Sequence, residues 1–131
     1  MNANELRIGN LVFHNGEIIA IKSIHPGDDD VNDEIPFHAI FGIPITEDWL
    51  LKCGFLQCEG KFGEYLKCSK LDGFRIWFHE NEQTSFWSIG RKEYETDETT
   101  LIFQGVKYIH QLQNLYFALT QTELEIETLQ V

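Results

Sequence analysis

The strongest structural signal in the sequence lies in residues 6–24, which read LRIGNLVFHNGEIIAIKSI. Two runs rich in β-branched and aromatic residues flank the pair Asn15-Gly16. Asn and Gly both tolerate a positive φ, which the two central positions of a tight hairpin turn require. We therefore predict a β-hairpin in which His14 and Glu17 face each other across the turn.

A third strand is predicted after this hairpin. Pro26-Gly27 and the acidic residues that follow mark a loop, and residues 35–43 form the next β-rich run, with Pro36 near its start. Three short strands within residues 1–43 predict a small curled β-subdomain, for which an SH3-like arrangement is one form.

A short helix is predicted in the segment PITEDWLLKCG, residues 44–54. Thr46 is a suitable N-cap, and Gly54 supplies the left-handed residue after the last turn. A helix of two turns holds only by packing an apolar face, which here carries Trp49, Leu50 and Cys53.

The remaining residues predict an antiparallel meander followed by a longer helix. The expected strands are 62–67, 74–79, 85–89 and 99–104, the helix covers 108–120, and residues 124–126 suggest a terminal strand. Together these elements predict one α+β domain over residues 1–131, with the β-subdomain at 1–43 and an α+β part at 44–131.

Composition narrows the class of protein. The 131 residues are 43% hydrophobic and 24% charged, which is typical of a globular chain. No apolar run approaches the roughly 20 residues that span a bilayer, and the N-terminal residues lack a signal-peptide pattern. Three cysteines, an odd number, favour free thiols in the reducing cytoplasm. We therefore expect a cytoplasmic protein without a membrane partner.

The formal net charge of −11 is concentrated in three segments. The first is an acidic patch of Asp28, Asp29, Asp30, Asp33 and Glu34, and the others lie at residues 93–98 and 123–127. Solvated loops are the plain interpretation, and an acidic surface for a basic protein partner is the functional one. Duplex DNA is disfavoured as a ligand because phosphate contacts need a basic face.

Motifs for metals, cofactors and nucleophiles are weak. Cys53, Cys58 and Cys68, with His79 further on, lack the paired spacing of a zinc site. The series Asp28-x-Asp30-x-Asn32 copies the start of a calcium loop, but the glycine and the bidentate glutamate are missing at later positions. We expect no metal, no cofactor and no enzymatic activity. A small hydrolase using Cys58 or Cys68 with His79 stays as an alternative.

Alternation along residues 74–79 places Arg75, Trp77 and His79 on one strand face. A cation, an indole and an imidazole together could stack a nucleobase, so a single-stranded nucleic-acid binder is a second alternative. The opposing interpretation is a buried layer in which a helix covers Trp77.

The helix at 108–120 carries a second face without charges. Opposite its core-facing stripe lie His110, Asn114 and Phe117, flanked by Gln111 and Gln113. Exposed helix faces normally carry charged side chains, and none occurs from Tyr108 to Thr122. We therefore predict that this face is covered, either by the chain's own N-terminal sheet or by a partner such as a second copy in a homodimer.

Three sequence blocks occur together in this chain: ELRIGN at residues 5–10, WLLK with GF at 49–55, and HQLQNLYFALT at 110–120. They resemble a family of small uncharacterised proteins encoded in bacterial, prophage and phage genomes. The resemblance covers about a quarter of the chain and implies a mobile-element context. It favours a non-enzymatic interaction or regulatory accessory protein that acts through protein–protein contacts.

Overall fold

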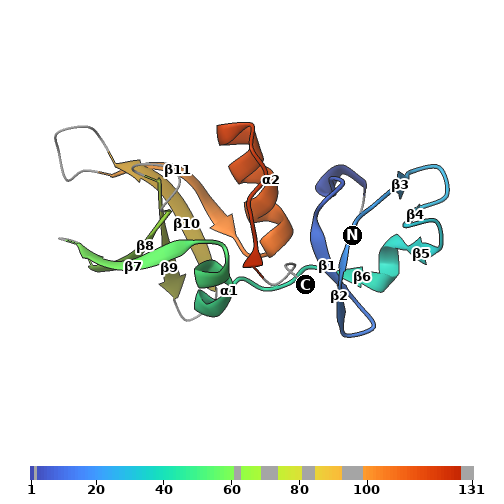
Figure 1. Ribbon diagram of the computed structural model, residues 1–131, viewed down its shortest axis with the longest axis horizontal. Coiled ribbons are helices and arrows are strands. Elements are labelled where there is room, and N and C mark those ends of the chain that lie inside the picture. Colours follow the sequence, from blue (N-terminus) through green and yellow to red (C-terminus); the bar gives the residue numbers. More distant parts are fainter. Residues whose placement is uncertain (2, 61–62, 69–73, 81–84, 93–98, 128–131) are drawn as a thin grey trace. The chain divides into compact units, whose positions relative to one another are not determined.

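A computed structural model describes residues 1, 3–60, 63–68, 74–80, 85–92 and 99–127. Its antiparallel sheets and helices confirm the predicted α+β class (Figure 1). The chain divides into two compact units. Unit 1 contains Met1–Pro44 and Tyr108–Leu124, and unit 2 contains Ile45–Lys107 and Glu125–Val131. The long C-terminal helix thus belongs with the N-terminal strands, whereas the sequence placed it in the part that begins at residue 44.

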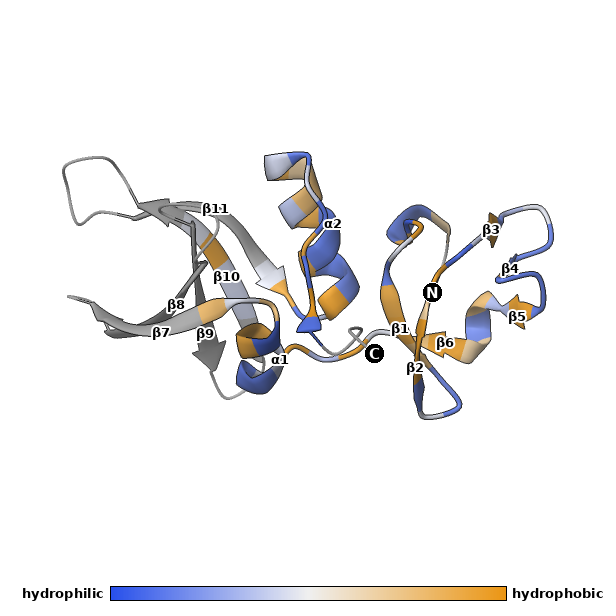
Figure 2. Ribbon diagram, viewed as in Figure 1, coloured by the Kyte–Doolittle hydropathy of each residue, from blue (hydrophilic) through white to orange (hydrophobic). Residues whose placement is uncertain are grey.

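The predicted hairpin forms in unit 1 from β1 (Leu11–His14) and β2 (Glu17–Ala20). Asn15 and Gly16 have φ values of 51° and 75°, which is the positive-φ pair that the turn requires. His14 pairs with Glu17 across the turn, as predicted. Figure 2 shows the polar turn at the end of two largely apolar strands.

The third strand differs from the prediction. The run at 35–43 is divided into β5 (Ile35–Pro36), the 3-10 turn η2 (Phe37–Ala39) and β6 (Ile40–Phe41). Two small sheets result, in the orders β2-β1-β6 and β3-β4-β5, where β3 is Ile24–His25 and β4 is Asp30–Val31. The SH3-like arrangement is not confirmed.

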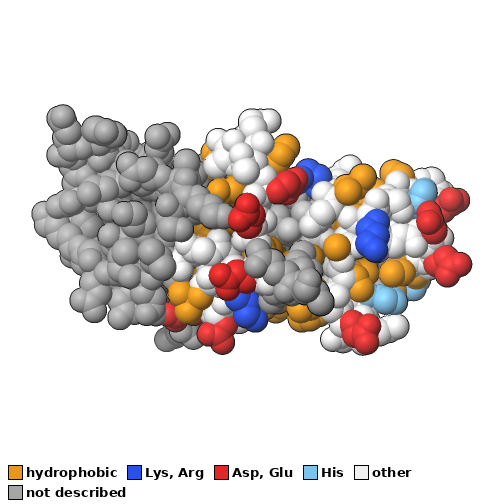
Figure 3. Space-filling view, in the orientation of Figure 1, with side chains coloured by type: hydrophobic (Ala, Val, Ile, Leu, Met, Phe, Trp, Pro, Cys, Tyr) orange, Lys and Arg blue, Asp and Glu red, His pale blue; other side chains and the backbone are white. Residues whose placement is uncertain are grey.

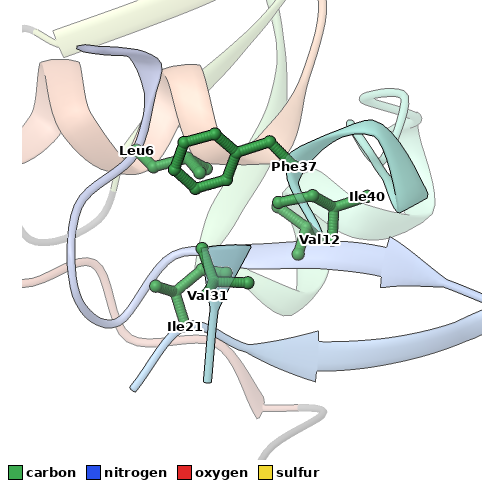
Figure 4. Packing of buried hydrophobic residues seen from close by; sticks show 6 residues of the cluster. All are labelled: Leu6, Val12, Ile21, Val31, Phe37 and Ile40. Atoms are coloured by element: carbon green, nitrogen blue, oxygen red, sulfur yellow. The ribbon is translucent and has the colours of Figure 1, made fainter. Parts of the chain in front are cut away.

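One apolar cluster joins these two sheets. It contains Leu6, Val12, Ile21, Val31, Phe37 and Ile40, all buried (Figure 4). Three of the residues come from the two sheets and Phe37 comes from η2. Leu6 follows the first 3-10 turn, η1 (Ala3–Glu5), and Ile21 follows β2. Residues that lie far apart in the sequence therefore share a single core.

The acidic segment at 28–34 is more than a solvated loop. Val31 is completely buried in the core of unit 1. The side chain of Asn32 accepts hydrogen bonds from the backbone amides of Lys22 (2.7 Å) and Ser23 (3.2 Å), and donates one to the carbonyl of Ala20 (3.0 Å). The plain interpretation of this segment as a loop is therefore wrong at its centre, which is fixed to the end of β2.

The main helix, α2 (Ile109–Thr120), completes unit 1. Its backbone joins the N-terminal part through the Ile109 amide, which donates to the Ile43 carbonyl at 2.9 Å. The ring of Tyr108 lies where a side chain on Gly42 would be, since a Cβ there would come within 2.5 Å of the ring. Only glycine fits at position 42 for this reason.

Unit 2 begins with the predicted short helix, α1 (Glu47–Lys52). The Thr46 hydroxyl accepts the Trp49 amide at 3.3 Å, which confirms the predicted N-cap, and Gly54 ends the helix with a φ of 88°. Leu50 and Cys53 are buried, while Trp49 is partly buried.

The rest of unit 2 is the predicted antiparallel meander. Its sheet has the order β11-β10-β9-β8-β7. The strands are β7 (Phe55–Gly60), β8 (Gly63–Cys68), β9 (Phe74–Glu80), β10 (Ser85–Lys92) and β11 (Thr99–Val106). β7 was not predicted, and the strand predicted at 124–126 does not form.

Candidate interaction surface

We define the α2 polar face as His110, Gln111, Gln113, Asn114 and Phe117, which the sequence singled out as a candidate interaction face. Gln113 is buried and binds the N-terminal segment with both ends of its amide. Its Oε1 accepts the Leu11 amide at 2.9 Å, and its Nε2 donates to the Gly9 carbonyl at 3.1 Å. The side chain of Gln113 thus binds two backbone groups that would otherwise need a neighbouring strand.

Asn114 continues this contact one residue further along α2. Its Nδ2 donates to the Glu5 carbonyl at 3.1 Å, and its Oδ1 accepts from Asn10 Nδ2 at 2.8 Å. Asn10 is fully buried, and its Oδ1 also accepts the Arg7 amide at 2.7 Å. The loop before β1 is therefore held on α2 by a chain of amide groups.

Arg7 covers the next turn of the helix. Its guanidinium lies over the ring of Phe117, 4.4 Å from the centroid, and also contacts the Gln113 carbonyl. The same group forms an ion pair with Glu123, in which Nη2 donates to Oε2 at 3.1 Å. The positive charge of Arg7 is thus paired with a carboxylate of unit 1.

His110 lies at the start of α2 and is only 2% exposed. Its ring stacks on Tyr108 with the centroids 5.8 Å apart, and its Nδ1 has no hydrogen-bond partner among the described residues. Burial lowers the pKa of His110, and the carboxylate of Glu5 partly opposes this shift. The neutral imidazole is therefore the form that suits this position. Gln111, which is partly buried, accepts the Tyr108 amide at 3.1 Å and caps the helix.

Residues 5–11 of the same chain thus lie on the α2 polar face. Of the two coverings that the sequence left open, the structure has the internal one. Gln113 and Asn114 already bind groups of the N-terminal segment, so their amides are not available to a partner protein.

A different surface, which sequence reasoning missed, is exposed on the sheet β2-β1-β6. Phe13 lies directly opposite Ile18 on β2 and Phe41 on β6. Residues paired across antiparallel strands share a face, so the three form one row across the sheet. We call them the apolar row. Phe41 is 63% exposed, Ile18 is 42% exposed and Phe13 is partly buried.

The apolar row lies on the face of the sheet opposite the unit 1 cluster that contains Val12 and Ile40. Val12 and Ile40, next to Phe13 and Phe41 in the chain, are buried in the unit 1 cluster. Successive residues of a strand point to opposite faces, so the row faces outward. Leu11 shares the outward face but is fully buried, at the position where Gln113 binds its amide.

Part of this row was within reach of the sequence. The Asn15-Gly16 turn fixes the register of the hairpin, and that register puts Phe13 opposite Ile18. The position of Phe41 in this row could not be predicted from the sequence, because it depends on η2 interrupting the predicted strand and on β6 pairing with β1.

Unit 1 as a whole is strongly acidic. Its two segments contain eight carboxylates against Arg7 and Lys22, which gives a formal net charge of −6. Of the acidic patch, Asp28, Asp29, Asp33 and Glu34 are exposed and Asp30 is partly buried. Figure 3 shows carboxylates gathered at the end of unit 1 that carries β3 to β5.

Two of these carboxylates of unit 1 form ion pairs. Asp33 contacts His25 at 2.8 Å, and Glu123 pairs with Arg7. The segment at 93–98 lies outside the described residues. A single acidic surface made by all three segments therefore stays an alternative to solvated loops. Among the described residues, no group of His, Cys, Asp and Glu could hold a metal ion.

The other candidate residues lie in unit 2. The backbone of Arg75, Trp77 and His79 belongs to β9, but their side chains lie outside the described part of the structure, as do those of Cys58 and Cys68. Cys53 is buried and is in no disulfide. The nucleic-acid and hydrolase alternatives thus stay predictions.

Comparison with protein-family models, curated proteins and solved structures finds no match for this chain. Among the described residues, no helix is long and apolar enough to cross a membrane.

Proposed function

We propose that the protein is a non-enzymatic accessory or regulatory protein of a phage or other mobile element, that it acts through protein–protein contacts, and that the apolar row is its binding surface. The observation that carries the proposal is the exposure of Ile18 and Phe41 on either side of Phe13, on the outward face of a sheet.

Exposed apolar residues are common when they stand singly, but a contiguous group is typical of a binding surface. Aromatic side chains such as Phe13 and Phe41 are enriched at the centres of protein interfaces, because they bury a large area with little loss of rotamer entropy. Removing Phe41 from water on binding would contribute on the order of 1–2 kcal/mol.

The sequence supports the biological setting that we propose for this protein. The resemblance of the three blocks to phage and prophage proteins supports a mobile-element context, and a regulatory or accessory protein fits a sequence without a recognised catalytic motif. The odd number of cysteines, with Cys53 buried as a thiol, supports action in the cytoplasm.

The test is a comparative pull-down from a lysate of the organism that encodes the protein. The bait is the full chain, either unchanged, as Phe41→Ser or as Leu51→Ser. Leu51 is the matched control because it is 45% exposed on α1 in unit 2. Bound proteins are quantified by mass spectrometry at low and at high salt.

We expect a protein that the unchanged bait and Leu51→Ser retain and that Phe41→Ser loses by tenfold or more. Capture that is the same with all three baits would overturn the role of the apolar row. Melting curves of the baits exclude unfolding as the cause.

A further inference from the structure

We infer that the partner binds unit 1 as an extended strand, which pairs with the outer edge of β2 and places an apolar side chain beside Ile18. This inference rests on the proposed function and deepens it, because it names the form in which the partner reaches the apolar row. The juxtaposition that carries it is a strand edge whose backbone groups lack a partner among the described residues, at one end of an exposed apolar row.

β2 is an edge strand, because its sheet has the order β2-β1-β6. The two-residue turn makes His14 and Glu17 a hydrogen-bonded pair, and bonded and non-bonded pairs alternate along antiparallel strands. The same alternation continues beyond β2, where the Ile21 amide donates to the Asn10 carbonyl at 2.8 Å. Ile18, one position after Glu17, therefore directs its amide and its carbonyl away from β1.

A side chain already binds the far end of this edge. Asn32 donates to the Ala20 carbonyl at 3.0 Å and accepts the Lys22 amide at 2.7 Å, as one residue of a neighbouring strand would. Three groups stay open, namely the amide and the carbonyl of Ile18 and the amide of Ala20. None of them has a hydrogen-bond partner among the described residues. A strand that ends before Asn32 can bind all three.

The side chain at this edge sets the apolar requirement. Ile18 is 42% exposed and ends the apolar row, in which Phe13 and Phe41 follow. A residue paired with Ile18 has its side chain on the same face of the sheet. An apolar side chain there would lengthen the row by one strand, about 4.8 Å. Backbone pairing and apolar contact thus favour the same occupant, as in other complexes in which a peptide adds a strand to a sheet.

A second copy of β2 fits this edge less well than a strand of another protein. In a two-fold pair centred on Ile19, the Ile18 amide meets the Ala20 carbonyl of the other copy, which Asn32 already binds. In a pair centred on Ile18, the Ala20 amide meets Gly16, a turn residue with a φ of 75°. Each register leaves one of the three open groups without a free acceptor on a strand. A segment of a different protein has no such restriction.

The test uses two labelled eight-residue peptides of one sequence, in which valine and threonine alternate, and measures their binding to the full chain by fluorescence anisotropy. One peptide is N-methylated at every threonine and the other at every valine. Neighbouring residues of a strand direct their backbone groups to opposite edges, so each peptide can pair through one edge only. The threonine-methylated peptide presents the amides of its apolar residues, and the valine-methylated peptide presents those of its polar residues.

We expect the threonine-methylated peptide to bind about tenfold more tightly, because its open edge pairs with β2 while a valine lies beside Ile18. Its binding should also slow the hydrogen exchange of the Ile18 and Ala20 amides about tenfold, as measured by NMR. The Ile19 amide points toward β1 and is the internal control, whose exchange should not change.

Two variants of the full chain separate the backbone from the side chain. Ile18→Pro removes the open amide at an edge position, where proline is tolerated, and Ile18→Val keeps that amide and most of the apolar surface. We expect Ile18→Pro to weaken the binding about tenfold and Ile18→Val to leave it within about twofold. Melting curves exclude unfolding as the cause. The peptide comparison and the exchange rates need no variant, so they decide the inference even if Ile18→Pro unfolds.

Four results would overturn the inference. They are equal binding of the two peptides, tighter binding of the valine-methylated peptide, no binding of either, and binding that leaves the exchange of the Ile18 and Ala20 amides unchanged. The lysate experiment keeps the proposed function separate. A partner that Phe41→Ser loses and that Ile18→Pro retains in full would support the proposed function and refute only the strand pairing.

Discussion

At the scale of single residues, the polar face of α2 carries side-chain amides where an exposed helix face normally carries charged side chains. These amides hydrogen-bond the N-terminal segment. Gln113, Asn114 and Asn10 together satisfy backbone groups of Glu5, Arg7, Gly9 and Leu11, at distances between 2.7 and 3.1 Å. An amide can both donate and accept, and it is buried at a lower cost than a charge. This explains why the polar face of α2 contains no charged residue.

Gln113 should therefore contribute more to the free energy of unfolding than a polar helix residue usually does. Gln113→Ala removes two hydrogen bonds and leaves the buried amide of Leu11 without its acceptor, so we expect a loss of about 2–3 kcal/mol in the free energy of unfolding. Gln111→Ala, which removes one helix-capping bond, should cost about 1 kcal/mol. Urea denaturation measures both, and equal losses would refute the special role of Gln113.

His110 should make unit 1 sensitive to mild acid. Burial lowers the pKa of the folded-state imidazole below the ordinary value of 6.5, so the unfolded chain binds the proton more readily. The stability that depends on neutral His110 is complete above that value. It is lost as the pH falls below 6.5 toward the folded-state pKa.

We expect the unchanged protein to lose more stability than His110→Leu between pH 7.5 and pH 5.5, by at most the roughly 1.4 kcal/mol that one proton allows over the pH unit below 6.5. Denaturation at the two pH values measures this difference. Equal losses in both proteins would show that His110 is protonated as easily in the folded state as in the unfolded chain.

At the scale of elements, short strands hold together because side chains bridge them. β3, β4 and β5 have two residues each, and Asn32 ties the segment after β4 to the end of β2. Two-residue strands contribute few ladder hydrogen bonds, so this side chain and the buried Val31 determine whether the second sheet forms.

Substitutions within the acidic segment at 28–34 should accordingly differ in their effect on the free energy of unfolding. Asn32→Ala removes three hydrogen bonds and a residue suited to its φ of 51°, and we expect a loss of about 2–3 kcal/mol. The exposed pair Asp28→Asn with Asp29→Asn should leave stability unchanged or slightly higher, because like-charge repulsion falls. Thermal unfolding checks both, and a stabilising effect of Asn32→Ala would contradict the structure.

At the scale of the whole molecule, local signals in the sequence predicted most elements but not their partners. The Asn15-Gly16 turn and the Thr46 N-cap were predicted because each depends on neighbouring residues. The association of α2 with the N-terminal part rests on pairs about 100 residues apart, such as Asn10 with Asn114. The apolar row likewise depended on a non-local pairing, that of Phe13 on β1 with Phe41 on β6.

The central claim is that the α2 polar face is internal and that the apolar row is the free surface. Asn114→Glu with Phe117→Lys would remove the donor to the Glu5 carbonyl and place a cation against Arg7. Phe41→Ser changes a side chain that is 63% exposed. Thermal unfolding of these two variants, with size measured by light scattering, tests the claim directly.

We expect the double variant to lose about 3 kcal/mol or more, and so to lower the melting temperature of unit 1 by over ten degrees. Phe41→Ser should lower it by a few degrees at most and leave the size unchanged. The claim would be contradicted if the double variant kept its melting temperature while Phe41→Ser unfolded the protein.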